Sequence, residues 1–234
     1  VTYGFAEHAD VRAVDVSQQG ARMQFTLCLP DGSRTQVELA LPGRHNVQNA
    51  LAASAVAWQL GVGNEAIARA LQKFAGIGRR FNQLATLPLA SGGEVTLVDD
   101  YGHHPKELAA VFDAARGGWA DKRLVVAFQP HRYSRTRDLF DEFAAVLSGV
   151  DALVLTEVYP AGEAPIAGAD AKSLARSIRT RGRVDPVVVN NAGELRDALA
   201  GVLRDGDLLL LMGAGDIGAA AQQLARNGFI GETA

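Results

Sequence analysis

Residues 123–138, RLVVAFQPHRYSRTRD, run from an apolar segment into a polar turn and then into the start of a helical pattern. A short apolar run that ends at a proline is typical of a buried strand. The same order recurs from residue 81 onward. It predicts strands near 81–87, 94–99, 123–128, 152–156, 187–190 and 207–212, and helices near 105–116, 136–147, 170–180, 192–203 and 216–226. Regular alternation predicts parallel strands joined by helical crossovers, so residues 81–234 are expected to form a doubly wound α/β sheet.

The first eighty residues have a different pattern. Residues 11–16 and 21–29 are strand-like, and the turn at 30–33 (PDGS) predicts a hairpin with residues 34–41. Two helices are expected next, from about 45 to 60 and from an N-cap at Asn64 to a stop at Gly76. We place the domain boundary at residues 76–80 (GIGRR). A hairpin with two helices makes a poor core alone, so residues 1–80 are expected to be the last portion of a longer domain.

The composition excludes several classes of protein. The chain has 234 residues, 48% of them hydrophobic and 21% charged, which is typical of a globular protein rather than a disordered one. A net charge of −3 offers no basic stripe for nucleic acid. The single cysteine excludes a disulfide framework, and no apolar run approaches the ~20 residues of a membrane span. The sequence therefore predicts a cytoplasmic protein that binds neither nucleic acid nor membrane.

Polar residues gather directly after the predicted strands. The stretches are DDYGHHP at 99–105, QPHRYSR at 129–135 and EVYP at 157–160. Four of the five histidines lie in these stretches or in the turn GRHN at 43–46. Because ligands of open α/β sheets bind beyond the carboxyl ends of the strands, this clustering predicts a polar site there.

The stretch DDYGHHP is compatible with three roles. Its imidazoles and carboxylates could hold a metal ion, although adjacent His103 and His104 point in different directions unless the backbone turns sharply. Its aspartates, tyrosine and histidines could bond a ribose or a substrate carboxylate. Alternatively, a histidine caps the helix that Pro105 opens, which is the favoured interpretation for His104.

Arg132 and Arg135 are three residues apart where a strand turns into a helix. Two guanidinium groups aimed together would bind a carboxylate or a phosphate in bidentate fashion. The alternative is a pair of surface arginines bonded to Asp138 or Asp141 one turn further on, and spacing alone does not decide between the two.

Three further patterns bear on nucleotides. Residues 213–218 (GAGDIG) match G-x-G-x-x-G after the last strand, but no acidic partner can follow about 20 residues later, so we interpret them as a close-packed turn. Asn46 and Asn49 share a helix face and could contact an adenine edge, although an N-cap with a buried polar contact is the favoured interpretation of this pair taken alone. No G-x-x-x-x-G-K-[ST] motif is present, so the chain is not a complete P-loop enzyme.

Taken together, these stretches resemble the Mur ligases, ATP-dependent amide-forming enzymes of peptidoglycan synthesis. The matching segments are LPGRHNVQNA (41–50), GRRF (78–81), DDYGHHP (99–105), FQPHRYSRTRD (128–138), EVYPAGE (157–163) and GAGDIG (213–218), in family order. The segments at 128–138 and 157–163 are similar to the branch of the family that adds L-alanine to UDP-N-acetylmuramate. The resemblance implies that residues 1–80 end a central P-loop ATPase-type domain, and that residues 81–234 form the Rossmann-like domain that binds the amino acid.

The resemblance also implies roles for individual residues. It implies a reaction in which the γ-phosphate of ATP passes to the muramoyl carboxylate and the amine of L-alanine then attacks the acyl phosphate. His45, Asn46, Asn49, Arg80, Asp100 and Tyr101 would lie at the ATP; His103, His131, Arg132 and Arg135 would surround L-alanine. Arg80 and His103 would be catalytic, and Arg79 is expected to point away from the site. No metal ligand is assigned here, because those for Mg²⁺ are expected in a preceding part of the protein.

Two alternatives to this function remain at the level of sequence. One is the sister ligase that attaches a recycled tripeptide to the same sugar. The other is a non-catalytic module that binds a nucleotide or a partner, and without a P-loop lysine the chain by itself is expected to be inactive. The sequence leaves open whether the protein forms a homodimer.

Overall fold

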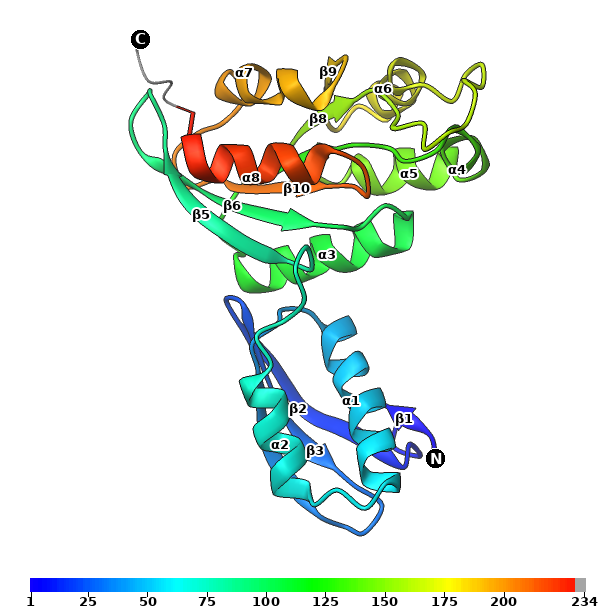
Figure 1. Cartoon of the computed structure of the whole chain (residues 1–234), viewed down its shortest axis with the longest axis vertical. Helices are drawn as coiled ribbons and strands as arrows, with labels where there is room; N and C mark the ends of the chain where they lie inside the picture. The colour runs from blue at the N-terminus through cyan, green and yellow to red at the C-terminus, as the bar shows by residue number, and fades with distance from the viewer. Residues whose placement is uncertain (230–234) are drawn as a thin grey trace. The chain divides into compact units, whose positions relative to one another are not determined.

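A computed structural model describes residues 1–229 (Figure 1). Chain contacts divide it into two compact units, one of residues 1–77 with 113–120, the other of 78–112 with the residues from 121 onward. Residues 230–234 of the predicted second domain lie outside the described residues. Each unit has its own sheet and its own apolar core.

The first unit is a four-stranded sheet in the order β1-β2-β3-β4. Its elements are β1 (Tyr3–Gly4), β2 (Val11–Gln19), β3 (Arg22–Cys28), β4 (Arg34–Leu39), α1 (Arg44–Gln59) and α2 (Asn64–Lys73). The predicted hairpin is confirmed as the antiparallel pair β3–β4. Asn64 is not the N-cap of α2: the helix begins at this residue after Gly63, and the Asn64 amide instead donates to the Ser33 hydroxyl.

The second unit is a six-stranded sheet in the order β5-β6-β10-β7-β8-β9. Its strands are β5 (Asn82–Pro88), β6 (Glu94–Asp100), β7 (Leu124–Phe128), β8 (Ala152–Thr156), β9 (Val187–Val189) and β10 (Leu208–Met212). The predicted parallel pairing is confirmed for the five neighbouring strands β6, β10, β7, β8 and β9. It is wrong for β5, which pairs antiparallel with β6. The connection at 89–93 is too short for a crossover and can only form a hairpin.

The helices of this unit follow the strands from β6 onward. They are α3 (Pro105–Gly118), α4 (Tyr133–Asp138), α5 (Phe140–Leu147), α6 (Ala171–Thr180), the 3₁₀ turn η1 (Ala192–Glu194), α7 (Leu195–Ala200) and α8 (Ile217–Asn227). Of α3, residues 105–112 belong to this unit, and the remainder is counted with the first unit. The single helix predicted over 136–147 is two helices that meet at Leu139. The predicted helix 192–203 is the 3₁₀ turn followed by α7.

Apolar strands hold the second sheet between two layers of helices. Every residue of β7, β8 and β10 is buried, as expected for parallel strands that are covered on both faces. Helices α7 and α8 pack on one face, and the ring of Phe143 in α5 lies 5.6 Å from that of Phe128 on the other. Figure 1 shows α3 and α8 on opposite sides of β6 and β10. Because β6, β10, β7 and β8 are parallel, the loops that follow them all lie at the carboxyl end of the sheet.

Backbone hydrogen bonds join these loops to one another. Gly213 donates to the Asp100 carbonyl over 3.2 Å, and Gln129 donates to that of Met212 over 3.0 Å. The loops after β7 and β8 exchange two bonds of 2.8 Å, from Arg132 to Tyr159 and from Tyr159 to Pro130. Side chains on these loops are consequently held by a connected backbone rather than by independent surface segments.

Candidate functional site

Asp100, the last residue of β6, braces the loop that follows it. Its side chain is buried, and its two carboxylate oxygens accept backbone N–H bonds of 2.7 Å from Phe81 and Gly102. Burial raises the pKa of Asp100, and the two amide bonds act in the opposite direction. One oxygen thus fixes the backbone at Gly102, and the other ties the end of β6 to Phe81. The contact of Asp100 with ATP stays a prediction.

His104 caps helix α3, as the sequence predicted. Its Nδ1 accepts from the backbone N–H of Lys106 over 3.3 Å, and its carbonyl accepts from Leu108 over 3.0 Å. The Glu107 carboxylate reaches back to the His104 N–H over 3.2 Å. This arrangement resembles a capping box, with histidine in the place usually taken by serine or threonine and its ring bonded to the second rather than the third N–H of the helix. His104 is therefore committed to the helix terminus.

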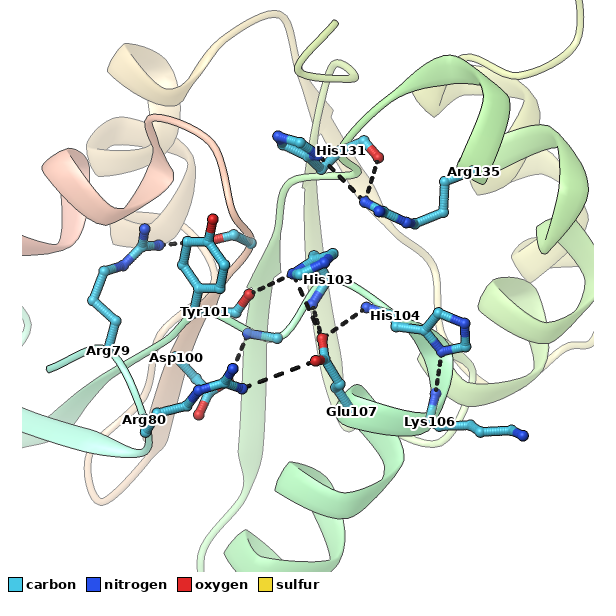
Figure 2. Close-up of polar contacts among 12 residues, drawn as sticks. Arg79, Arg80, Asp100, Tyr101, His103, His104, Lys106, Glu107, His131 and Arg135 are labelled. Carbon is cyan, nitrogen blue, oxygen red and sulfur yellow. Dashed lines mark hydrogen bonds and ion pairs between the residues drawn. The ribbon is translucent and has the colours of Figure 1, made fainter. Parts of the chain in front are cut away.

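His103 lies beside the same carboxylate but turns its ring the other way. Its Nδ1 is 3.0 Å from the Tyr101 carbonyl oxygen and 3.5 Å from Glu107 Oε2, and its backbone N–H donates to Oε2 over 2.9 Å. The ring centroid is 5.9 Å from that of His131. Figure 2 shows the His103 ring between Glu107 and His131. The loops after β6 and β7 thus bring two imidazoles together.

His131, Arg132 and Arg135 surround the start of α4. Arg132 has a left-handed backbone with φ of 74°. This conformation is uncommon for residues other than glycine, and where it occurs it is concentrated at functional sites. The His131 ring stacks on Tyr159, with centroids 5.5 Å apart and planes within 8°. Arg135 Nη1 lies 3.3 Å from His131 Nδ1 and donates to the His131 carbonyl over 3.2 Å (Figure 2).

The two arginines differ in their acidic neighbours. Arg132 Nη1 is 3.7 Å from Glu163, whose carboxylate also accepts from the Ser134 N–H and hydroxyl. Arg135 has no carboxylate within ion-pair distance among the residues that the structure describes. Among the described residues neither arginine pairs with Asp138, which pairs with Arg137, or with Asp141. A half-buried guanidinium without a counterion favours binding of an anion.

Burial and the neighbouring charges favour the neutral form of His131. Burial lowers the pKa of His131, and the nearby Arg135, His103 and Arg132 lower it further. Since an arginine N–H can only donate, the Arg135 contact makes Nδ1 the acceptor of the neutral ring and places its hydrogen on Nε2. His131 is therefore suited to donate a hydrogen bond rather than to carry a charge.

Arg79 and Arg80 precede β5 and have different surroundings. Arg79 pairs with Asp99, a fully buried carboxylate, over 3.2 Å and donates to the Gly213 carbonyl over 2.5 Å. The expectation that Arg79 points away was wrong, because the buried Asp99 draws it inward. Arg80 remains half exposed, with Glu107 4.0 Å away and the Tyr101 ring centroid 6.0 Å from its guanidinium carbon.

The turn at 213–218 is closely packed, as predicted. An added Cβ at Gly215 would lie 2.2 Å from the Gln129 side-chain oxygen, and one at Gly218 would lie 2.4 Å from the guanidinium of Arg79. Glycine is needed here because neighbouring side chains fill the space that a Cβ would take. That packing accounts for the glycines without a nucleotide.

The remaining ATP residues of the prediction lie in the first unit. The Asn46 amide donates to the Pro42 carbonyl over 2.8 Å, the ring of His45 lies beside Gly43, and Asn49 is exposed further along α1. Asn46 and Asn49 are one turn apart on α1. Their role as adenine ligands stays a prediction.

Sequence reasoning missed the acidic residues of the site. Glu107 contacts both neighbouring histidines, and Glu163 contacts Arg132. Glu107 could have been found from its position three residues after a helix cap, where a capping box predicts a glutamate. Glu163 and Tyr159 lie on a loop of irregular backbone, and no local sequence pattern predicts their contacts with Arg132 and His131.

The described residues hold no group of three histidine, cysteine or acidic side chains placed to bind a metal ion. Within residues 1–229, no helix combines the length and apolarity that a membrane crossing requires.

Comparison with known proteins gives consistent matches. Residues 79–215 match the family model "Mur ligase, glutamate ligase domain", and residues 1–57 match "Mur ligase middle domain". The chain is 69% identical over all 234 residues to a UDP-N-acetylmuramate–L-alanine ligase of Xanthomonas euvesicatoria, of which it covers 49%. The chain therefore spans about half the length of the curated relatives it matches.

Solved structures agree with this. A UDP-N-acetylmuramate–alanine ligase from Thermotoga maritima superposes with a TM-score of 0.78 at 26% identity, over 97% of this chain and 47% of the other. A MurF ligase from the same organism, solved in complex with ADP, has a TM-score of 0.68 over 97% of this chain and 48% of its own. At 14% identity, the second match shows the fold alone.

Proposed function

The chain belongs to the Mur ligase family, and on that premise we propose that the protein containing it joins L-alanine to UDP-N-acetylmuramate with ATP. In this proposal the second unit binds the amino acid, and the first unit is the end of the central ATP-binding domain. The relative at 69% identity carries the name of this activity, which favours it over the tripeptide-recycling alternative. The protein would act in the cytoplasm during cell-wall synthesis.

One observation carries the assignment of the amino-acid site. Arg135 is partly buried beside the ring of His131, and no carboxylate among the described residues neutralises it. L-alanine offers little side-chain surface, so its affinity must come largely from its carboxylate and its amine. Arg135 and the half-exposed Arg132 supply guanidinium donors for the carboxylate. His103 and His131 lie next to these donors, where the amine would be placed.

The proposed chemistry gives this chain two roles. The first is to hold the amine against the acyl phosphate that ATP generates on the muramoyl carboxylate. The second is to take up a proton. As the amine nitrogen bonds to the carbonyl carbon, the bond from that carbon to the phosphate oxygen breaks and phosphate leaves, while the amine proton passes to a ring nitrogen of His103.

Arg80 is proposed to stabilise charge on the phosphoryl group. It is half exposed, and its nearest acidic group among the described residues is 4.0 Å away, so its guanidinium is available to a ligand. Asp100 and Tyr101 would support the ATP side, with His45, Asn46 and Asn49 at the adenine. Mg²⁺ would accompany ATP, and no residue of this chain is assigned to it.

An omission experiment on the full-length protein tests the proposal. Phosphate release is measured with ATP, UDP-N-acetylmuramate and L-alanine, and then with each left out in turn. We expect release only when all three are present. Release that is unchanged without L-alanine, or that needs a tripeptide in its place, would overturn the assignment. Arg80→Ala should lower the rate of ligation more than it weakens binding of the UDP-sugar.

A further inference from the structure

Glu107 is the acidic residue around which the site is arranged. Its Oε2 accepts the backbone N–H of His103 over 2.9 Å and that of His104 over 3.2 Å, and it lies 3.5 Å from His103 Nδ1. Its Oε1 is 4.0 Å from Arg80 Nη1 (Figure 2). One carboxylate thus contacts the residues that we placed at the amine and at the phosphoryl group.

These contacts determine which nitrogen of His103 carries the hydrogen. The Tyr101 carbonyl oxygen, 3.0 Å from Nδ1, can only accept, and an ionised Glu107 can only accept as well. Both groups converge on Nδ1, so the neutral ring keeps its hydrogen on Nδ1. Nε2 is then left with a lone pair, which is the form that can take a proton from an amine.

We propose that Glu107 is a positioning residue that holds His103 in the Nδ1–H tautomer, with Nε2 open to the amine of the incoming amino acid. The inference rests on the proposed function for its catalytic consequence. Its structural part, the tautomer of His103, stands on the contacts of the second unit alone. In the ligation step the amine nitrogen bonds to the carbonyl carbon, phosphate leaves, and Nε2 receives the amine proton.

A structural role as a helix cap must be separated from this role. Glu107→Gln retains an oxygen that can accept from the two backbone N–H groups, but it removes the negative charge beside Nδ1. His104→Ala removes the other half of the capping box and leaves the Glu107–His103 contact in place. Glu194→Gln is a matched control, since Glu194 also accepts a backbone N–H near a helix start, from Asn190 over 3.0 Å.

The first measurement is the ring ¹⁵N NMR spectrum of histidine-labelled 234-residue chain. The wild type should show His103 protonated on Nδ1, and Glu107→Gln should raise the share of the Nε2–H form. His104→Ala and Glu194→Gln should leave the His103 tautomer unchanged. A wild-type His103 protonated on Nε2, or a tautomer that Glu107→Gln does not move, would overturn the proposal.

The second measurement is steady-state ligation by the full-length protein. Glu107→Gln should lower kcat about tenfold to a hundredfold, a part of what a general base contributes, and should change the KM for L-alanine little. An unchanged kcat, or an equal loss in His104→Ala, would reduce Glu107 to a cap and refute the inference. Absence of ligation in the wild type would refute the proposed function instead, and the NMR result would still decide the tautomer.

Discussion

Replacement of Arg135 by alanine tests the amino-acid site with a magnitude that the structure supplies. Arg135 is partly buried and donates only to His131 among the described residues, so most of its five donors are available to a ligand. A charge-assisted hydrogen bond contributes about 1.5–3 kcal/mol. Arg135→Ala should therefore raise the KM for L-alanine about tenfold to 150-fold.

Arg132 should matter less, for reasons that are visible in its surroundings. Half of its side chain is exposed, and Glu163 already lies 3.7 Å from its Nη1. Exposed and shared charges contribute only about 0.2–1 kcal/mol, so Arg132→Ala should raise the same KM no more than about fivefold. The KM values for ATP and for UDP-N-acetylmuramate should change little in either variant.

The assay is phosphate release by the full-length protein as a function of L-alanine concentration. Arg137→Ala serves as the control, because Arg137 is exposed and pairs with Asp138 over 2.8 Å. Arg135→Lys should restore binding only in part, since an ammonium lacks the planar fork of donors. A raised KM for ATP with that for L-alanine unchanged would show that the arginines bind phosphate. A larger effect at Arg132 than at Arg135 would refute the argument from burial.

Three further outcomes follow from the packing and charges of the second unit. Arg79→Ala leaves the buried Asp99 without its cation and should lower the free energy of unfolding by about 3 kcal/mol in denaturant titration; a smaller loss when Asp99→Asn is added would confirm the pair. Gly215→Ala should cost about 1–3 kcal/mol because its Cβ would meet neighbouring side chains, whereas Gly78→Ala, with open space around it, should be nearly neutral. Because the folded-state pKa of His131 is lowered, acidification below pH 6.5 should destabilise the wild type, and His131→Gln should flatten this dependence; equal pH profiles would contradict the neutral state inferred for the ring.

The alternation of strands and helices was predictable because its signals are local. Apolar runs such as 124–128 and 208–212 and the polar turns after them define the parallel part of the sheet without knowledge of distant contacts. The antiparallel β5 was missed although its five-residue connection to β6 excludes a crossover. The length of this connection predicts a hairpin, but the regular alternation of strands and helices after it led us to expect a parallel strand.

The site was predictable where one short segment supplies both chemistry and position. His104 beside Pro105 was expected to cap a helix and does so. The inward turn of Arg79 depends on Asp99, twenty residues away, and the ion pair of Arg132 depends on Glu163 in another loop. Such pairs form only when the sheet brings its strand ends together, so spacing along the chain does not reveal them.

The central claim is that the loops after β6 and β7 bind the amino acid, and a crystal structure of the full-length protein with L-alanine and a non-hydrolysable ATP analogue tests it most directly. The account predicts the alanine carboxylate within hydrogen-bond distance of the Arg135 guanidinium and the amine next to Nε2 of His103. Alanine bound away from both groups, or the nucleotide phosphates on Arg135 in its place, would contradict the claim.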